Sequence, residues 1–239
     1  MNQQPHASWA HIYDRAYELS FGSLYDSLTE HTIAVVQQVL GPAGNIVDLG
    51  AGTGRLTLPL LDRGYSVTSV EPCQAMADEL QKKRVGTPLD IRVAKMVDFQ
   101  SPVSYDMALC VFTVIAYILN PDELAQSLTN VYESLRPGGL LLLEVPSRIL
   151  FQGHSAKSPQ MSRTVHVRQK SDVEFEYNEN IRQTSDSGNT ETSVDIFTIR
   201  YWPLEDVKKI LTMIGFNIAV EHTVVIERLG PDYVLLRKP

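Results

Sequence analysis

Hydrophobic residues over positions 45–145 fall alternately into short continuous runs and one-sided stripes, which predicts strands alternating with helices. The apolar runs predict strands at 46–49, 65–71, 90–94, 105–111 and 140–145. The stripes predict helices at about 55–62, at 74–84 and from Pro121 onward, where Asn120 supplies the cap. Such alternation forms a mostly parallel, doubly wound sheet that binds ligands beyond the carboxyl ends of its strands.

Two segments fall outside this alternation. The first 40 residues have helical periodicity, with Ser23 and Asp26 at a predicted helix start. Residues 160–200 have the two-residue alternation of antiparallel strands, with a turn at 185–191. Pro203 then opens a helix that Gly215 closes, and two strands follow. We therefore predict one elaborated domain, divided into a helical segment at 1–40, a core at 41–150, an antiparallel insert at 151–202 and a final helix with two strands at 203–239.

Composition limits the class of protein. The 239 residues are 44% hydrophobic, which suits one large core. Two cysteines make no disulfide framework, and Cys110 lies in an apolar run as a buried residue would, so we expect a reducing, cytoplasmic compartment. No signal peptide is evident, and the longest apolar run, 107–119, is too short for a bilayer, so we expect a soluble protein with no membrane partner. A net charge of -7 argues against a nucleic acid partner.

Three glycines stand where the first strand passes into a helix: Gly50, Gly52 and Gly54. Such a loop directs backbone N–H groups and the positive end of a helix dipole at an anion, and glycine allows close approach. The anion is either a dinucleotide pyrophosphate or the carboxylate of S-adenosylmethionine. A dinucleotide site has the spacing G-x-G-x-x-G, whereas here it is G-x-G-x-G and position 55 is arginine, which favours S-adenosylmethionine. Glu71, at the end of the second strand, is placed to accept both ribose hydroxyls.

The segments IVDLGAGTGRLTLPLLDRGYSVTSVEPCQAM, AKMVDF, YDMALCVFTVIAYI and LRPGGLLLLEV together resemble class I S-adenosylmethionine-dependent methyltransferases. The resemblance covers roughly residues 40–145 and implies a Rossmann-like, seven-stranded, mostly parallel sheet with helices on both faces, together with S-adenosylmethionine as the cofactor.

The resemblance also implies a set of cofactor-binding residues. Asp48 and the loop of Gly50, Ala51, Gly52 and Gly54 would hold the methionine part, and Glu71 the ribose. The adenosine would be lined by Pro72 and Met76, the adenine wrapped by Met96, Val97 and Asp98, and the floor near the sulfonium closed by Val111 and Phe112. Lys95 departs from the family pattern, because many relatives have an acid there that accepts a hydrogen bond from adenine, and lysine cannot accept one. Whether Asp98 reaches the base or braces its loop stays open.

The N-terminal helix, the FTVIAYI stretch and the insert resemble small-molecule methyltransferases of the sugar-amine and glycine N-methyltransferase kind. In those, residues corresponding to 1–40 form a lid, for which Tyr13, Tyr17 and Tyr25 are candidates, and the insert covers the acceptor or pairs subunits, which suggests a homodimer. Around the acceptor cavity we place Tyr117, Arg148, Arg200 and Trp202; an arginine there would favour an acceptor with a carboxylate or phosphate.

Methyl transfer from a sulfonium needs mainly close, in-line orientation, and a hydroxyl acceptor would also want a general base. The six histidines are dispersed, without metal-ligand spacing or an acidic neighbour in sequence, so no base or metal site is evident and no catalytic residue is assigned. His154 is read as an exposed loop residue rather than a pocket residue. We therefore predict methyl transfer to a small molecule, at an amine nitrogen in preference to a hydroxyl. The alternatives are an NAD(P)-dependent oxidoreductase and a non-catalytic binding module.

Overall fold

A seven-stranded sheet forms the centre of the molecule in this computed structural model, which describes residues 4–84, 86, 88–102, 104–185, 187–223 and 230–239. Its strands are β1 (Asn45–Leu49), β2 (Ser66–Val70), β3 (Asp90–Arg92), β4 (Tyr105–Cys110), β5 (Leu135–Val145), β10 (Asn217–Thr223) and β11 (Asp232–Arg237). Their order is β10-β11-β5-β4-β1-β2-β3, and β11 alone among them pairs antiparallel with both neighbours. The predicted Rossmann-like, mostly parallel sheet is confirmed.

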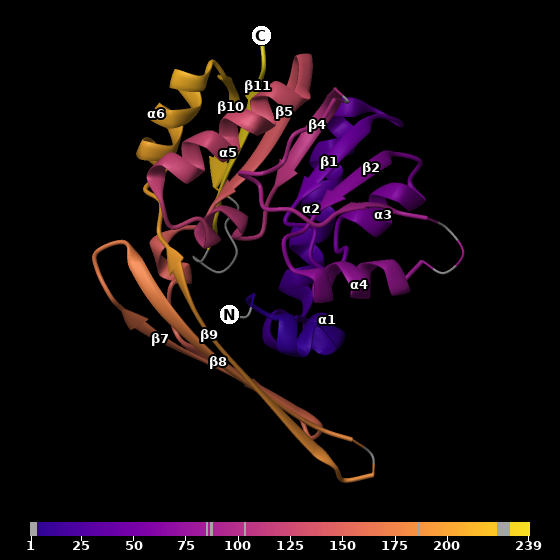
Figure 1. Cartoon of the computed structure of the whole chain (residues 1–239), viewed down its shortest axis with the longest axis vertical. Helices are drawn as coiled ribbons and strands as arrows, with labels where there is room; N and C mark the ends of the chain where they lie inside the picture. Colours follow the sequence, from indigo (N-terminus) through magenta and orange to yellow (C-terminus); the bar gives the residue numbers. More distant parts are fainter. Residues whose placement is uncertain (1–3, 85, 87, 103, 186, 224–229) are drawn as a thin grey trace.

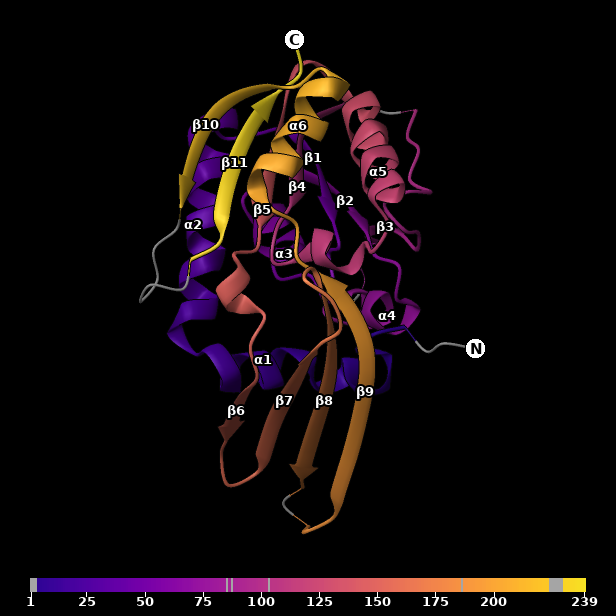
Figure 2. The same ribbon diagram turned by 90° about the vertical axis from the view of Figure 1, so that its left-hand side faces the viewer.

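Helices cover both faces of this sheet (Figure 2). On one face α5 (Pro121–Ser134) and α6 (Leu204–Ile214) pack on residues such as Val47 and Leu141. On the other, α2 (Ser23–Leu40) and α3 (Thr57–Asp62) pack on neighbouring strand positions such as Ile46 and Leu142. Because successive strand residues point to opposite faces, continuous apolar runs fill both cores. The helix α4 (Gln74–Lys82) follows β2.

The cap prediction for α5 is confirmed, because Asn120 Oδ1 accepts hydrogen bonds from the N–H groups of Asp122 and Glu123. The predicted helix start is confirmed, because α2 begins at Ser23 and has Asp26 in its first turn. Gly22, with φ 49°, occupies the cap position, and no side chain caps the helix. A positive φ lets the chain turn sharply between α1 (Tyr13–Phe21) and α2, and glycine takes that conformation readily.

A second, four-stranded antiparallel sheet extends away from the α/β layers (Figure 1). It comprises β6 (His154–Lys157), β7 (Met161–Gln169), β8 (Glu174–Thr184) and β9 (Thr190–Arg200). The antiparallel insert is confirmed, with one addition. The chain forms the short strand β6, so His154 is a half-buried strand residue and not the exposed loop residue predicted. Of the predicted turn at 185–191, Asp186 lies outside the described residues.

The N-terminal segment joins the two sheets. The 3-10 helix η1 (Ala7–Ile12) contacts α4 and β9, while α1 contacts β6 and β7. Two further 3-10 turns, η2 (Val114–Tyr117) and η3 (Arg148–Leu150), follow β4 and β5. None of the described helices is both long enough and apolar enough to span a bilayer. The space between the carboxyl ends of the central strands and this N-terminal segment is where the site lies.

Candidate cofactor and acceptor site

A cavity of about 1040 Å³ lies beyond the carboxyl ends of β1, β2 and β4. Its walls also include the N-terminal residues His6 and Tyr13, the turn η2, and residues 194–198 of β9. The position agrees with the rule for doubly wound sheets. Ends of parallel strands form one wall, and the insert together with the N-terminus forms the other.

The three loop glycines have different surroundings, although each has a positive φ. A Cβ on Gly50 would lie 2.5 Å from Val114 Cγ2, and one on Gly54 would lie 2.3 Å from Leu80 Cδ1. A Cβ on Gly52 would meet its first neighbour, Met76 Cε, at 3.6 Å. Gly50 and Gly54 are therefore required by packing as well as by backbone conformation, whereas Gly52 faces the open cavity.

Four backbone donors of this loop are already occupied. The N–H groups of Gly50 and Ala51 donate to the Val70 carbonyl at 2.8 and 3.1 Å, and the Gly52 N–H donates to Glu71 Oε2 at 2.9 Å. The Gly54 N–H donates to the Ala51 carbonyl at 2.9 Å. The expectation that loop donors point at a bound anion is corrected for these four N–H groups, because they hold the loop together and against the end of β2.

Glu71 is fixed by two backbone donors. Besides Gly52, the Cys73 N–H donates to its Oε1 at 2.9 Å, so the carboxylate is oriented at the cavity wall. Burial raises the pKa of Glu71, and the two N–H donors oppose that shift. An oriented carboxylate with remaining lone pairs can accept hydrogen bonds from the vicinal hydroxyls of a ribose.

Asp48 is buried at the end of β1 and lines the cavity. The Thr57 hydroxyl donates to Asp48 Oδ2 at 2.7 Å, and Ser69 Oγ lies 2.9 Å from the same hydroxyl. Burial raises the pKa of Asp48 from 3.8 to about 6, against the opposing effects of Thr57 and Arg55. In the ligand-free protein, burial thus destabilises the ionised Asp48 carboxylate at neutral pH, and a cationic group of a ligand would stabilise the ionised form.

Arg55 is a site residue that motif reading did not find. It lines the cavity, its guanidinium lies 4.6 Å from the Phe112 ring centroid and 5.5 Å from that of Tyr25, and Nη1 donates to the neutral Thr29 hydroxyl at 2.9 Å. A guanidinium held between aromatic rings keeps planar N–H pairs available for a carboxylate. The signal in the sequence was the arginine directly after the third glycine.

The chain after β4 is held in an unusual conformation. Phe112 and Thr113 have φ 69° and 65°, a left-handed region that residues with a Cβ seldom adopt. Both N–H groups donate to the buried Glu144 carboxylate, at 2.6 and 2.9 Å. Burial raises the pKa of Glu144, and these donors oppose it. The strain is localised where both residues line the cavity, as is common at functional sites.

Most predicted cofactor residues lie together in the cavity wall. These are Tyr13, Tyr25, Asp48, Gly50, Ala51, Gly52, Glu71, Pro72, Met76, Met96, Val97, Val111 and Phe112. Lys95 and Tyr117 line it as well. Gly54 does not, because it packs against Leu80, and Asp98 is an exposed residue of the loop after β3.

Three residues predicted around the acceptor lie elsewhere. Arg148 Nη1 donates to the Asp172 carbonyl, and Arg200 Nη1 donates to the Leu119 carbonyl. Trp202 is buried, with Nε1 donating to the carbonyls of Ile115 and Ile118. All three brace the junction between the sheets and do not line the cavity, so Arg148 and Arg200 give no support for an acidic acceptor. Tyr17 of the predicted lid stacks on Tyr13 behind the wall.

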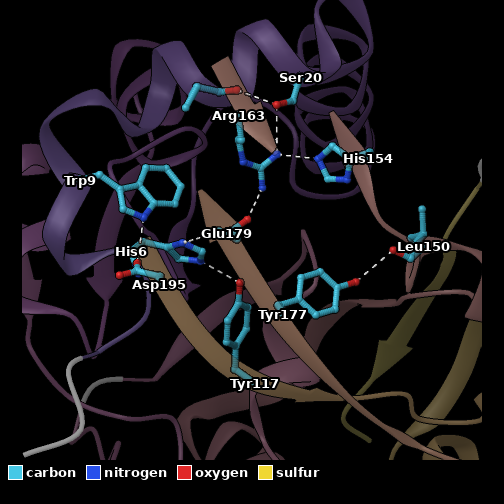
Figure 3. Close-up of polar contacts among 11 residues, drawn as sticks. His6, Trp9, Ser20, Tyr117, Leu150, His154, Arg163, Tyr177, Glu179 and Asp195 are labelled. Carbon is cyan, nitrogen blue, oxygen red and sulfur yellow. Dashed lines mark hydrogen bonds and ion pairs between the residues drawn. The ribbon is translucent and has the colours of Figure 1, made fainter. Parts of the chain in front are cut away.

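The structure also gives a histidine an acidic partner that sequence proximity could not reveal. His6 lies between Tyr117 and Glu179, residues of η2 and β8 (Figure 3). Within the described ranges, no three His, Cys, Asp or Glu side chains group as metal ligands would.

Comparison with known proteins defines the class. Residues 46–139 match the family model described as a methyltransferase domain. A putative methyltransferase of Geobacillus sp. (strain WCH70) is 31% identical over 107 residues, which cover 44% of this chain and 43% of the relative, so the chain spans less than half of that relative's length.

Solved structures match over nearly the whole chain. An S-adenosylmethionine-dependent methyltransferase from Clostridium acetobutylicum has a TM-score of 0.80 at 17% identity, over 98% of this chain and 99% of that one. An amino pentose methyltransferase from Micromonospora echinaspora, solved with S-adenosylmethionine, has a TM-score of 0.77 at 17% identity, over 95% of this chain and 97% of that one. A sugar N-methyltransferase from Streptoalloteichus sp. has a TM-score of 0.73 at 20% identity, over 96% of this chain and 92% of that one.

Residues 46–139 therefore match a methyltransferase domain, and the chain has the fold of the class I S-adenosylmethionine-dependent methyltransferases, as predicted. S-adenosylmethionine is the cofactor of this class, and the cavity presents the Glu71 carboxylate, the Arg55 guanidinium and open space over Gly52. The dinucleotide alternative loses its support.

Proposed function

We propose that the protein transfers the methyl group of S-adenosylmethionine to the nitrogen of a small-molecule amine. In this proposal Glu71 holds the ribose hydroxyls, Arg55 holds the methionine carboxylate, and Asp48 faces the cofactor's ammonium group. When bound, the cofactor supplies an electrophilic methyl group. The protein's part is to orient the acceptor lone pair toward it, an effect that can contribute several kcal/mol.

The side chains that line the cavity opposite the strand ends favour an amine as the methyl acceptor. The described lining residues from the N-terminal segment, η2 and β9 include the rings of Tyr13, Tyr117 and Phe197, with Asp195 among them, and contain neither lysine nor arginine. Glu176 of β8 lines the cavity as well, with its carboxylate paired to Arg168. Aromatic faces and carboxylates attract an ammonium group and repel a carboxylate or phosphate. The sugar N-methyltransferase with the same fold supports this choice.

We also propose that residues 1–40 act as a lid. Asp14 of α1 accepts a hydrogen bond from the Thr53 hydroxyl at 2.5 Å and forms an ion pair with Lys83, whose Nζ also donates to the Thr53 carbonyl at 2.7 Å. These contacts tie α1 to the glycine loop. Opening the segment would break them and expose the cavity.

Calorimetry with S-adenosylmethionine and S-adenosylhomocysteine tests the cofactor, and absence of binding to the wild-type protein would refute the proposal. The acceptor class is tested with isotope-labelled S-adenosylmethionine against matched pairs of amino sugars and their hydroxyl counterparts, read by mass spectrometry. Label in the amine member of a pair supports nitrogen transfer. Label in the hydroxyl member alone would contradict it.

A further inference from the structure

The His6 ring connects the cavity to a buried carboxylate. Its Nε2 lies 2.9 Å from Tyr117 Oη, and its Nδ1 lies 3.2 Å from Glu179 Oε2 (Figure 3). A carboxylate beside Nδ1 favours the tautomer with the proton on Nδ1, which leaves Nε2 as an acceptor for the Tyr117 hydroxyl. His6 and Tyr117 both line the cavity. A phenol oxygen that donates its own proton inward keeps its lone pairs for a donor in the cavity.

The position of His6 is enforced by the insert. Its backbone has φ 67° and ψ -4°, and its N–H donates to Asp195 Oδ2 of β9 at 2.7 Å. The same carboxylate accepts from Trp9 Nε1 at 2.8 Å and from Ser8 Oγ at 2.9 Å. A left-handed histidine persists only where its surroundings hold it. Asp195 thus anchors the N-terminal turn so that the ring meets Tyr117 and Glu179.

Negative charge predominates around the ring. Glu179 of β8 faces Nδ1 of His6, and Asp195 of β9 accepts a hydrogen bond from the His6 backbone N–H. Glu71, at the end of β2, also interacts electrostatically with His6. Against these three carboxylates stands Arg163 of β7, paired with Glu179 at 2.5 Å. The other titratable groups that contact the ring are tyrosines, namely Tyr13 and Tyr17 of α1 and Tyr117 of η2, and Trp9 and Phe197 also pack on it. The charged groups around the ring are therefore mostly carboxylates.

The neighbouring groups remain in fixed charge states. Tyr117 is 38% exposed as a whole, but desolvation of its hydroxyl raises the pKa of Tyr117 well above its usual value, so the hydroxyl stays protonated at neutral pH. Nη1 of Arg163 donates to His154 Nε2 at 2.8 Å, and burial together with Arg163 lowers the pKa of His154. His154 is thus uncharged and adds no cation near Glu179.

We propose that His6 accepts, through the Tyr117 hydroxyl, the proton that the acceptor amine must lose for methyl transfer; this rests on the proposed function. The proton passes from the amine nitrogen to Tyr117 Oη as the tyrosine proton moves to His6 Nε2, forming an imidazolium beside Glu179. The freed lone pair forms the nitrogen–carbon bond while the carbon–sulfur bond breaks and sulfur keeps its electron pair. His6 later returns the proton to water. Glu179 is a positioning residue.

A binding experiment tests this without a known acceptor. Sinefungin carries an amino group in place of the transferable methyl group of S-adenosylmethionine, so its ammonium lies next to the position of the acceptor nitrogen. Its affinity is compared with that of S-adenosylhomocysteine by calorimetry between pH 5.5 and 8. Protonated His6 repels the ammonium and neutral His6 does not, so we expect the preference for sinefungin to rise about fivefold or more with pH in the wild type.

Three variants complete the design. His6→Asn tolerates the left-handed conformation but does not titrate, and Tyr117→Phe removes the hydroxyl while keeping the ring. Both should flatten the pH dependence while binding S-adenosylhomocysteine within about threefold of wild type, which shows an intact site. His11→Asn is the matched control and should leave the pH dependence of the sinefungin preference unchanged. His11 is an exposed histidine of η1 whose Nε2 lies 3.8 Å from Glu191 Oε2.

The outcomes separate the two proposals. If neither ligand binds the wild-type protein, the proposed function fails. If both bind but the preference is independent of pH, or if its pH dependence survives in His6→Asn, the role of His6 is refuted while the function stands. With an amine acceptor in hand, kcat/KM at neutral pH should fall in His6→Asn and stay unchanged in His11→Asn.

Discussion

Replacing Asp48 by asparagine should stabilise the ligand-free protein at neutral pH. Asp48 is 4% exposed, and its pKa is raised from 3.8 to about 6 by burial. The native state therefore binds this proton more tightly than the unfolded state, so stability is greatest below pH 4 and falls as the pH rises through 6. From the two pKa values the cost of the carboxylate is about 1 kcal/mol at pH 4.5 and about 3 kcal/mol at pH 7.5.

Asparagine keeps the hydrogen bond from Thr57, since its Oδ1 can accept at the same place. Burying the amide NH₂ costs about 1 kcal/mol, so Asp48→Asn should be close to neutral at pH 4.5 and more stable by about 2 kcal/mol at pH 7.5. Urea denaturation at both pH values measures the difference. The same variant should bind S-adenosylhomocysteine about tenfold more weakly, because a charge facing the ligand ammonium is lost.

Asp106→Asn is the matched control. Burial opposes ionisation of Asp106, but the Asn45 N–H and Arg136 outweigh it and hold its pKa below the usual value. The ionised Asp106 carboxylate therefore stabilises the fold above pH 4, and this contribution is lost only as the pH falls through the lowered pKa of Asp106. Asp106→Asn should therefore lower the free energy of unfolding equally at pH 4.5 and 7.5. If Asp48→Asn also shows one constant difference at both pH values, Asp48 does not titrate in this window and the reasoning is refuted.

Three further predictions concern the cavity wall. Gly52→Val should abolish S-adenosylhomocysteine binding in calorimetry, because the valine side chain would enter the open cavity at a residue with a positive φ. Gly54→Ala should lower the free energy of unfolding by about 2 kcal/mol, because its Cβ would clash with Leu80, and should affect binding less. Equal effects of the two variants on binding would contradict this assignment. Arg55→Gln should weaken the binding of S-adenosylhomocysteine about 30-fold. The affinity for methylthioadenosine, which lacks the carboxylate, should stay within twofold of wild type. An equal loss of affinity for both ligands would show that Arg55 acts on folding. Lys95→Asp should tighten S-adenosylhomocysteine about threefold by adding an acceptor for the adenine amino group, and unchanged affinity would place that contact elsewhere.

Much of the core followed from local pattern. The apolar run before Gly50 and the stripe after Asn120 specify a strand and a helix by their own periodicity, and the observed elements lie within a few residues of those expected. Where the expectation failed, a long-range contact decided. The donors of the glycine loop were taken by Val70 and Glu71, and Arg200 and Trp202 turned to carbonyls of the chain after β4.

The strand and helix order, the insert and the glycine loop can be predicted from the amino-acid sequence, because hydrophobic period and backbone conformation are properties of neighbouring residues. Which side chains meet in the cavity depends on how distant segments pack. His6, Tyr117 and Glu179 come from three distant segments, and their meeting depends on Asp195 binding the N-terminal turn and Arg163 pairing with Glu179. Such contacts form because buried charges must be paired once the sheets pack, a condition that no single stretch of sequence carries.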